Sequence, residues 1–440
     1  MKEITILACI WGKHMPILYH YLARLPDTHK RTLIFMQYLE DATITALDEL
    51  DAKVLTLKEA AHAFSEMEKY EVQKDTIKTR TQMAKAFNMP AWKDFCSQIG
   101  APLKLTTDTI SQKLYEKSEK INFYIKWLEK FKRNHFIELI ITSEDVTAIA
   151  RTTILWGQKE RIPSLQIQHS PGTGRQPPIH NQHLADHMTV YGERAADAFA
   201  ISPNEPLHIT GNHNWAVYTR HHAQTEQVRT HINNQYTLPD NTALVLFGTT
   251  WASQLSAHID QQIHAKTLAT VCHAISLLKT QGHAVVLVIK DRDSNAEFEQ
   301  ETQMAHALAA KYGLTSDDFR YTTKDLVHLI IAADVVISSD SSLSVEAMHA
   351  LTPAINVDTQ WPMILGPSFH AEDGILSVID YNAEQLARFI QSLLFDPVMR
   401  KKHLDKMQQH VGFFNASATT DKALDNITDL MKRIKRPLPA

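Results

Sequence analysis

Cysteine is scarce in this sequence. The 440 residues include only Cys9, Cys96 and Cys272, which lie far apart and form no C-x-x-C pair. Such spacing argues against a disulfide framework and against a cysteine-based zinc site. Cys9 and Cys272 sit within apolar runs, where a buried structural thiol is the usual outcome.

Long apolar runs and a charge surplus are also missing. No segment offers about 18 consecutive apolar residues, the length that a membrane-spanning helix requires. The N-terminus carries an acid at Glu3 and lacks the layout of a secretory signal. The formal net charge is only -4, without a clear basic stripe. We therefore expect a cytoplasmic protein that has no nucleic-acid partner.

Several motifs with well-defined chemistry are absent as well. No G-x-G-x-x-G opens a helix, and the sequence has no G-x-x-x-x-G-K-[ST] loop or G-x-S-x-G elbow. His213, His221 and His222 fall close together among 24 histidines, but no H-E-x-x-H or comparable spacing occurs. Asp291 and Asp293 spell D-x-D, a weak signal when it stands alone. We expect surface histidines, no bound metal and no cofactor.

What the sequence does contain is an alternation of short β-rich runs with helical stretches. An apolar fraction of 44% with 21% charged residues is typical of a globular protein, and the length allows two or three domains. The alternation predicts an α/β fold with parallel sheets covered by helices on both faces. The predicted strands are Ile4–Ile10, Leu33–Tyr38, Lys53–Leu57, Phe136–Thr142, Ser164–Gln168, His187–Tyr191, Ala243–Phe247, Ala284–Ile289, Asp334–Ser338 and Ala354–Val357.

A polar segment divides the pattern into two blocks. Residues 214–241 contain few apolar side chains and end in a turn-like Leu-Pro-Asp-Asn sequence, as a linker does. We predict a first domain over residues 1–213 and a second over 242–415. The remaining residues, 416–440, contain a helix near Thr420–Ile434 that is placed to fold back onto the first domain.

Within the first block the strand pattern stops over residues 58–133, where 15 Lys/Arg stand against 10 Asp/Glu. We expect a helical insertion, whose last helix should bury one apolar stripe. The positive surplus indicates either a solvated basic face or a surface that rests on an anionic membrane or polymer. The stripe consists of Leu114, Ile121, Ile125, Leu128 and Phe131.

A strand, a serine-rich loop and a helix follow one another in the second block. A helical pattern over Leu326–Ala333 leads into the β run Asp334–Ser338, and a new helix opens at Val345. Hydroxyl groups at such a strand end donate to phosphate oxygens, and the helix N-terminus adds partial positive charge. Glu346, in the first turn, is placed to accept hydrogen bonds from ribose hydroxyls. A plain capped helix explains the local sequence equally well. The serines concerned are Ser341, Ser342 and Ser344.

The run Ala333–Val357 resembles the donor-site segment of GT-B-fold glycosyltransferases. It is most similar to bacterial enzymes that build capsule or lipopolysaccharide glycans and to the related polyol-phosphate transferases. Three further stretches resemble elements of the same family and occur in the family's order. They are Leu165–Ser170, Ala185–Asn212 and Ala243–Ser253.

Three positions depart from the family pattern. Ser170 stands where the family usually has glycine. Ser338 lies eight residues before Glu346, so the paired-glutamate E-x7-E motif of one large retaining group is absent. Lys290 and Asp291 are not followed by the His-Pro that is usual in polyol-phosphate transferases. Inverting and retaining chemistry therefore both stay open.

The resemblance implies a GT-B-like fold, in which two doubly wound Rossmann-type domains face each other across a cleft. It also implies transfer of a sugar from a nucleotide-sugar donor to a hydroxyl of a bacterial cell-surface glycan or glycolipid, without a metal, at the inner membrane face. Lys290 and Arg292 would neutralise phosphate charge there, although exposed turn charges explain them equally well. The full set of expected donor-binding residues is Gly248, Thr249, Thr250, Lys290, Arg292, Tyr321, Thr322, Ser341, Ser342, Ser344 and Glu346.

The loops of the first block should hold the acceptor. Gly12 permits a close approach after the opening strand, and Lys13 and His14 can contact an anionic sugar. A base that deprotonates the acceptor hydroxyl is expected at another strand end of this block. Asp145 can equally be a helix cap. The candidates for the base are Glu144, Asp145 and His169.

Three other functions stay open at this point. The run Trp11–Pro16 distantly resembles the opening loop of sugar-nucleotide 2-epimerases, which share the architecture. Their S-G-G-x-x-E-E segment is replaced here by Ser-Ser-Leu-Ser-Val-Glu-Ala. A polyol-phosphate transferase and a non-catalytic protein that binds sugar nucleotides are the further alternatives.

Overall fold

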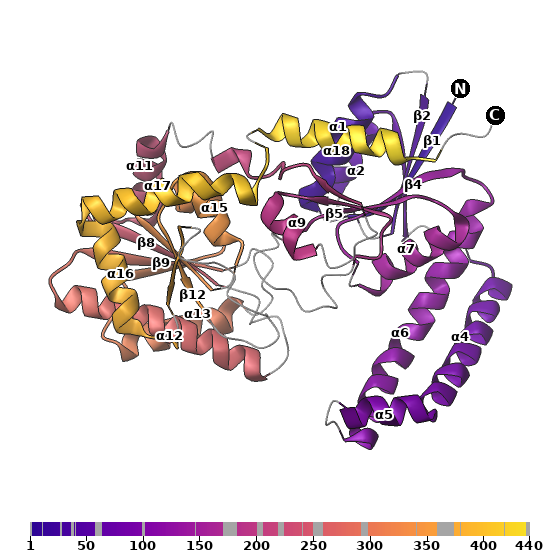
Figure 1. Ribbon diagram of the computed structural model, residues 1–440, viewed down its shortest axis with the longest axis horizontal. Helices are drawn as coiled ribbons and strands as arrows, with labels where there is room; N and C mark the ends of the chain where they lie inside the picture. Colours follow the sequence, from indigo (N-terminus) through magenta and orange to yellow (C-terminus); the bar gives the residue numbers. More distant parts are fainter. Residues whose placement is uncertain are drawn as a thin grey trace.

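The chain forms two parallel β-sheets, which lie side by side along the long axis of the molecule (Figure 1). The structure is a computed structural model. It describes residues 2–436 except 11, 27–28, 37–38, 40, 58–63, 99–101, 146, 170–182, 200–205, 219–223, 240, 250–257, 292–297, 340, 359–373, 379 and 418.

The first sheet has seven strands in the order β3-β2-β1-β4-β5-β6-β7, and the paired strands run parallel. Both faces of β1 are buried, because helices cover the sheet on both sides. The strands are β1 (Lys2–Cys9), β2 (His29–Phe35), β3 (Ala52–Thr56), β4 (Ile137–Thr142), β5 (Ser164–Ile167), β6 (His187–Val190) and β7 (Leu207–Ile209).

Alternate side chains of β1 face two separate cores. Ile6 and Ala8 pack in a core with α1, α2 and the last helix, α18 (Thr420–Ile434), whereas Leu7 and Cys9 pack on the other face with α4, α6 and α7. The helices and the short 3-10 turn of this half are η1 (Gly12–His14), α1 (Met15–Ala23), α2 (Asp41–Asp48), α4 (Glu66–Phe87), α5 (Pro90–Gln98), α6 (Leu103–Lys132), α7 (Ala148–Glu160) and α9 (Glu193–Phe199).

The second sheet has six strands in the order β10-β9-β8-β11-β12-β13, again with parallel pairs. Its strands are β8 (Ala243–Gly248), β9 (Val285–Lys290), β10 (Phe319–Thr322), β11 (Val335–Ser338), β12 (Ala354–Val357) and β13 (Leu376–Val378). The accompanying helices are α11 (Thr225–Tyr236), α12 (His258–Thr280), α13 (Phe298–Lys311), α14 (Leu326–Ala332), α15 (Leu343–Ala350), α16 (Ala383–Phe395) and α17 (Pro397–Phe414).

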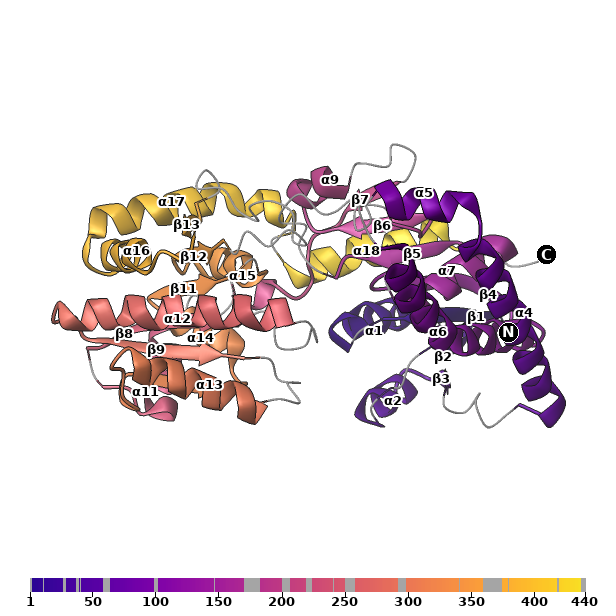
Figure 2. The same ribbon diagram turned by 90° about the horizontal axis from the view of Figure 1, so that it is seen from below.

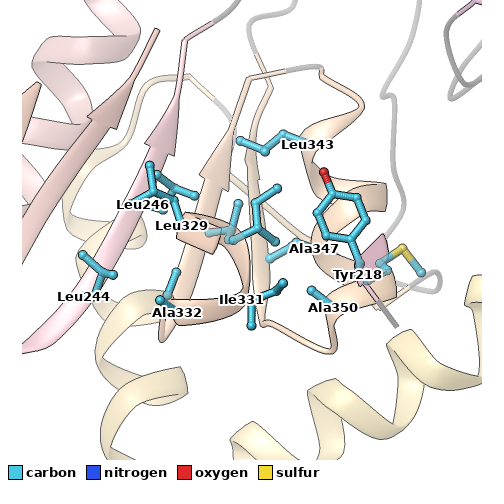
Figure 3. Close-up of a cluster of buried hydrophobic side chains, with 14 of the residues drawn as sticks. Tyr218, Leu244, Leu246, Leu329, Ile331, Ala332, Leu343, Ala347 and Ala350 are labelled. Carbon is cyan, nitrogen blue, oxygen red and sulfur yellow. The ribbon is translucent and has the colours of Figure 1, made fainter. Parts of the chain in front are cut away.

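Two cores also sandwich the second sheet. Val245 and Phe247 of β8 pack with α12, α13 and α16 on one face. Leu244 and Leu246 pack with α11, α14, α15 and α17 on the other, and Figure 3 shows this second core from the side. Tyr218 belongs to the same core, although it precedes the sheet in sequence, so the connecting segment is built into the second half.

The chain then returns to the first half through its last two helices, as Figures 1 and 2 show. Helix α17 packs on α15, α16 and α9, and α18 packs on α1. The crossing is tight: a Cβ on Gly192 would lie 2.4 Å from the carbonyl oxygen of Phe413. Gly211 has a φ of +86° and faces Ser417, so glycine meets a conformational and a steric requirement there.

The predicted α/β fold with two doubly wound domains and a helical insertion is confirmed. Each of the ten predicted strands is present, with β2 beginning earlier than expected, at His29. The segment 214–241, predicted as a linker, contains α11, which packs on α14. The domain boundaries themselves stay predictions. Among the described residues, no helix combines the length and the apolar character that crossing a bilayer requires.

The predicted apolar stripe of the insertion is only partly buried. Leu128 is fully buried in the core beneath the first sheet, but Leu114 and Ile125 are exposed. The prediction that this helix buries the stripe therefore holds for Leu128 and fails for Leu114 and Ile125. The physical reason is that α6 extends beyond the sheet, where α4 and α5 are its main packing partners.

Candidate functional site

Both sheets reverse their strand order at one point, and polar residues gather at both points. The first sheet reverses between β1 and β4, and the second between β8 and β11. In open parallel sheets, ligands bind beyond the carboxyl ends of the strands at such a switch point. The residues predicted for the acceptor follow β1 and β4, and most of those predicted for the donor follow β8 to β11.

The start of α15 lies at the switch point of the second sheet. Glu346, in its first turn, accepts a hydrogen bond from Oη of Tyr218 at 2.5 Å and another from Oγ of Ser342 at 3.1 Å. Ser341 and Ser342 are partly exposed, and Oγ of Ser341 accepts a hydrogen bond from the backbone N–H of Leu343 at 3.4 Å. The carboxylate of Glu346 is thus held in place by two protein hydroxyls.

Ser344 occupies a different position from the other loop serines. It is fully buried, and its hydroxyl is 2.5 Å from that of Ser338 at the end of β11. The sequence predicted a hydroxyl that donates to phosphate, but this side chain points inward and joins the helix to the strand. Any contribution of Ser344 to an anion site would come from its backbone.

Asp291, which directly follows β9, is surrounded by three of the predicted donor residues. Its carboxylate accepts hydrogen bonds from Oγ1 of Thr249 at 2.6 Å and from Oη of Tyr321 at 2.8 Å. Nζ of Lys290 donates to its backbone oxygen at 2.5 Å. Asp291 is buried, with 3% of its surface exposed. The arrangement holds the ends of β8, β9 and β10 together.

Gly248 brings this group close to α15. A Cβ at Gly248 would lie 2.2 Å from Cδ2 of Leu343, so glycine lets the first residue of α15 rest on the end of β8 without a shift of the leucine side chain. Thr322 points elsewhere, since its Oγ1 lies 3.1 Å from the hydroxyl of Tyr236 on α11. Thr250 and Arg292 lie outside the described residues.

Three histidines gather at the first sheet. The ring of His14 lies 6.0 Å from that of His169, which follows β5, and 5.5 Å from that of His213. Nζ of Lys13 donates to the backbone oxygen of His169 at 2.7 Å, and the carbonyl oxygen of Lys13 lies 3.1 Å from Nε2 of His213. Gly12, at the edge of the group, has open space where a Cβ would stand.

The environment of His14 and His213 disfavours their charged forms. His14 is fully buried, and burial lowers its pKa well below 6.5, helped by the nearby His213, Lys13 and His169. Burial lowers the pKa of His213 to about 4. Neither ring nitrogen of His14 has a hydrogen-bond partner among the described residues. The rings of His14 and His213 are therefore neutral near pH 7, the form in which imidazole accepts a proton.

Two carboxylates follow β4, and they differ in their surroundings. Oδ2 of Asp145 accepts a hydrogen bond from the backbone N–H of Leu184 at 2.9 Å, so this side chain fixes another segment. Glu144 is half-buried, and burial raises its pKa above the usual value. Burial likewise raises the pKa of Asp145. The cap of α7 is Thr147, whose hydroxyl accepts from Ala150, so Asp145 does not have the alternative capping role.

Metal binding has no geometric support in this part of the molecule. Within the described ranges, no group of three or more His, Cys, Asp or Glu side chains is placed to hold a metal ion. The expectation that His213 lies at the surface is wrong, because only 3% of this residue is exposed to solvent.

The segment 213–218 connects the histidines of the first sheet with the residues around Glu346. His213 lies against His14 and Lys13 of the first half. Two residues later, Trp215 packs on His349 of α15, and Tyr218 reaches Glu346. Burial raises the pKa of Tyr218 well above 10, and Glu346 raises it further, so its hydroxyl keeps the proton that it donates.

Comparison with known proteins identifies the fold. No family model and no curated protein matches the sequence. Solved structures do match. A glycosyltransferase from Rickettsia africae aligns over 99% of both chains at 13% identity, with a TM-score of 0.56. The Anabaena protein HepE in complex with UDP and glucose aligns over 97% of this chain and 99% of its own, at 11% identity and a TM-score of 0.52.

A third structure has another activity on the same framework. UDP-GlcNAc 2-epimerase from Neisseria meningitidis, bound to UDP-GlcNAc, aligns over 98% of this chain and all of its own, at 12% identity and a TM-score of 0.55. At such identities the likeness establishes architecture only. The chain has the two-domain GT-B fold.

Proposed function

We propose that this protein is a glycosyltransferase that moves a sugar from a nucleotide-sugar donor to an acceptor hydroxyl. The observation that carries the proposal is the pair Tyr218 and Glu346 at the first turn of α15. A carboxylate fixed beside a helix N-terminus, at the switch point of a parallel sheet, suits a ribose on one side and a phosphate on the other. The family resemblance of the sequence around Glu346 points to the same ligand.

The donor would bind over the carboxyl ends of β8 to β11. The N-terminus of α15 would face the diphosphate, together with Ser341 and Ser342, and Glu346 would accept the ribose hydroxyls. Thr249 and Tyr321, held through Asp291, would line the other side of the nucleotide. Lys290 adds positive charge at the same edge. Thr250, Arg292, Thr322 and Ser344 stay in the proposed set with their predicted roles, Ser344 through its backbone.

The acceptor would lie at the first sheet, beside Gly12, Lys13 and His14. A base there would take the proton of the acceptor hydroxyl while its oxygen attacks the anomeric carbon. Glu144 and His169 fit this role better than Asp145, because a backbone N–H already occupies a carboxylate oxygen of Asp145. The bond between the anomeric carbon and the phosphate oxygen would break, and the nucleotide would leave with the electron pair and the added negative charge. The dipole of α15 and Lys290 would stabilise that charge.

The finer assignments are proposals of the same kind. A growing bacterial cell-surface glycan or glycolipid is the proposed acceptor, and the cytoplasm, at the inner face of the membrane, is the proposed location. Both follow the family resemblance. Since the helix N-terminus and Lys290 supply positive charge at the leaving phosphate, we propose a reaction that needs no metal or other cofactor.

A sugar-nucleotide 2-epimerase is the second candidate function. The observation that favours it is the similarity of this chain to the Neisseria enzyme, whose TM-score is nearly that of the Rickettsia glycosyltransferase. The two reactions differ in their need for an acceptor. Epimerisation occurs in nucleotide sugar alone, whereas transfer requires a second hydroxyl-bearing substrate.

Binding and turnover measured together would test the proposal. The full-length protein would be titrated with UDP, CDP, CMP and GDP by thermal shift, because a ligand of the folded state raises its melting temperature. Nucleotide sugars of the preferred base would then be incubated with and without glycan acceptors. Acceptor-dependent nucleotide release supports a transferase, and a changed sugar without acceptor supports an epimerase. The lack of any nucleotide effect would refute both.

A further inference from the structure

The helical insertion forms an arm that projects from the first domain (Figure 1). Helices α4 and α6 run side by side, and α5 lies across their far end. With 30 residues at 1.5 Å each, α6 spans about 45 Å. Trp127 and Leu128, near its end, are buried in the core beneath the first sheet, so the arm is firmly seated at its base.

The middle of the arm is joined by specific contacts. The guanidinium of Arg80 on α4 donates to Oγ of Ser118 at 3.0 Å and to the backbone oxygen of Tyr115 at 2.9 Å, both on α6. Nδ2 of Asn122 reaches Oγ1 of Thr76 at 3.3 Å. These bonds make α4 and α6 a single stiff unit that carries α5 at its tip.

The tip exposes large apolar side chains. Trp92 stacks on Phe95, with ring centroids 5.5 Å apart, and meets Phe87 edge to face at 5.1 Å. Its indole N–H donates to Thr107. Phe95 is 45% exposed. The remaining exposed side chains of the tip are Met89 (55%), Leu103 (39%) and Leu105 (66%).

This exposure is concentrated on the arm. Among the described residues, nine of the fifteen large apolar side chains that are exposed belong to residues 66–132. Of the other six, four lie in or next to α17, and Leu155 and Ile209 stand alone. Apolar surface that is gathered in one place, instead of spread singly, marks a binding surface.

Positive charge is concentrated on the same part of the arm. The inner half, residues 66–77 and 118–132, has six Lys/Arg and six Asp/Glu. Some of these charges neutralise each other in ion pairs, such as Lys126 with Glu71 and Lys130 with Glu68. The outer half, residues 78–117, has seven Lys/Arg against three Asp/Glu. In its described part none of the lysines forms an ion pair.

We infer that the outer half of the arm docks on an anionic lipid bilayer. Exposed Phe, Leu and Met side chains beside lysines are a composition with which interfacial helices enter the headgroup region. The negative surface potential of such a bilayer attracts each nearby lysine. The chain as a whole has a net charge of -4 although the arm is positive, so the attraction also orients the molecule with its arm toward the lipid.

Charge also decides between a bilayer and a second copy of the chain. Two arms that met tip to tip would place Lys93 and Lys104 against the same lysines of the other copy. Like charges in such contact are unfavourable. The bilayer inference does not rest on the proposed function, because it concerns residues far from Glu346 in the fold, and nucleotide binding is measured separately.

Vesicle co-sedimentation of the full-length protein would test the inference. The probes are vesicles of phosphatidylcholine alone and of phosphatidylcholine with about one third phosphatidylglycerol. We expect binding to the anionic vesicles, weak binding to the neutral ones, and release at high salt. The variant Lys93→Glu/Lys104→Glu should bind the anionic vesicles at least about tenfold more weakly, and Phe95→Ser/Leu105→Ser should bind similarly weakly.

Matched controls lie on α17 of the second domain. Val398→Ser/Met399→Ser removes two exposed apolar side chains, and Lys402→Glu/Lys406→Glu reverses two exposed lysines. Both should bind vesicles as the wild type does. Circular dichroism and nucleotide thermal shifts should be unchanged in all four variants. Equal binding by tip and control variants would overturn the inference. So would a wild type that ignores anionic vesicles, binds only anionic polysaccharide, or forms a dimer that the tip variants abolish.

Discussion

Oη of Tyr218 and Oε2 of Glu346 lie 2.5 Å apart, although 128 residues separate them in the sequence. Tyr218 belongs to the segment that connects the two sheets, and Figure 3 shows its ring within the core with its hydroxyl toward the end that carries Leu343. The conformation of the segment between the domains is therefore coupled to the orientation of the carboxylate. Any ligand that binds Glu346 would act on this connection.

The first prediction concerns the role of Glu346 in nucleotide binding. Replacing Glu346 by Gln removes the charge that would accept ribose hydroxyls, and hydrogen bonds to charged groups contribute about 1.5–3 kcal/mol. We expect a dissociation constant for the preferred nucleotide that is roughly 10–100 times higher, measured by calorimetry. Tyr218→Phe should weaken binding less, because the carboxylate stays and loses only one of its two protein donors.

Glu384→Ala is the matched control for this prediction. Glu384 is also an acid in the first turn of a helix of the second half, α16, and it is exposed. Its replacement should leave nucleotide affinity unchanged. If Glu346→Gln bound nucleotide like the wild type, the proposed place of the ribose would be wrong.

Gly248 supports a prediction about the distance between β8 and α15. In Gly248→Ala, the new methyl group would collide with Leu343, which is buried and has little room to move. We expect a loss of about 1–3 kcal/mol in the free energy of unfolding, measured by urea titration, and weaker nucleotide binding. In Gly248→Ala/Leu343→Ala the collision disappears. The loss of unfolding free energy in this double variant should therefore be smaller than the sum of the losses in the two single variants. Simple additivity would show that the contact does not matter.

A third prediction concerns the buried carboxylate of Asp291. Asp291→Ala leaves the hydroxyls of Thr249 and Tyr321 without the acceptor that they share. We expect a loss of about 2–4 kcal/mol in the free energy of unfolding, since buried polar groups that lose a charged partner are costly. Nucleotide affinity should fall as well. Asp317→Ala, at an exposed turn of the same half, is the control, and equal effects of the two variants would contradict the structural role of Asp291.

The parts of the fold that could be predicted from the sequence are those with a local pattern of apolar residues. The β runs of the sheet centres and the helix Thr420–Ile434 are marked by local apolar periodicity, and they lie where predicted. The strands β7, β10 and β13 are not among the ten predicted strands. Each has three or four residues at a sheet edge with half-exposed positions, so none shows the continuous apolar run of a central strand.

Contacts between residues that are distant in the sequence could not be predicted, because a local sequence pattern does not show which distant segments meet. The serine loop and Glu346 are visible in one stretch of sequence, but Tyr218 has no motif that would connect it to them. Asp291 was set aside as a chance D-x-D, because its partners lie 42 and 30 residues away. His213 sits in a polar stretch typical of a surface, and only the packing of the two halves buries it.

The burial of His213 leads to the last prediction, which concerns acid stability. Its pKa is about 4 in the folded protein and about 6.5 when unfolded, so between these values the unfolded state binds more protons. The free energy of unfolding should therefore fall as the pH drops through this window, by about 2 kcal/mol from this group between pH 7.5 and pH 5.

His213→Gln keeps an N–H donor for the carbonyl of Lys13 but does not titrate. Urea titrations at both pH values should show a pH effect smaller by that amount in His213→Gln, whereas His231→Gln, at an exposed position of α11, should behave like the wild type. An unchanged pH effect in His213→Gln would mean that His213 takes up a proton in the folded state as readily as in the unfolded state, so that its pKa is not lowered by burial.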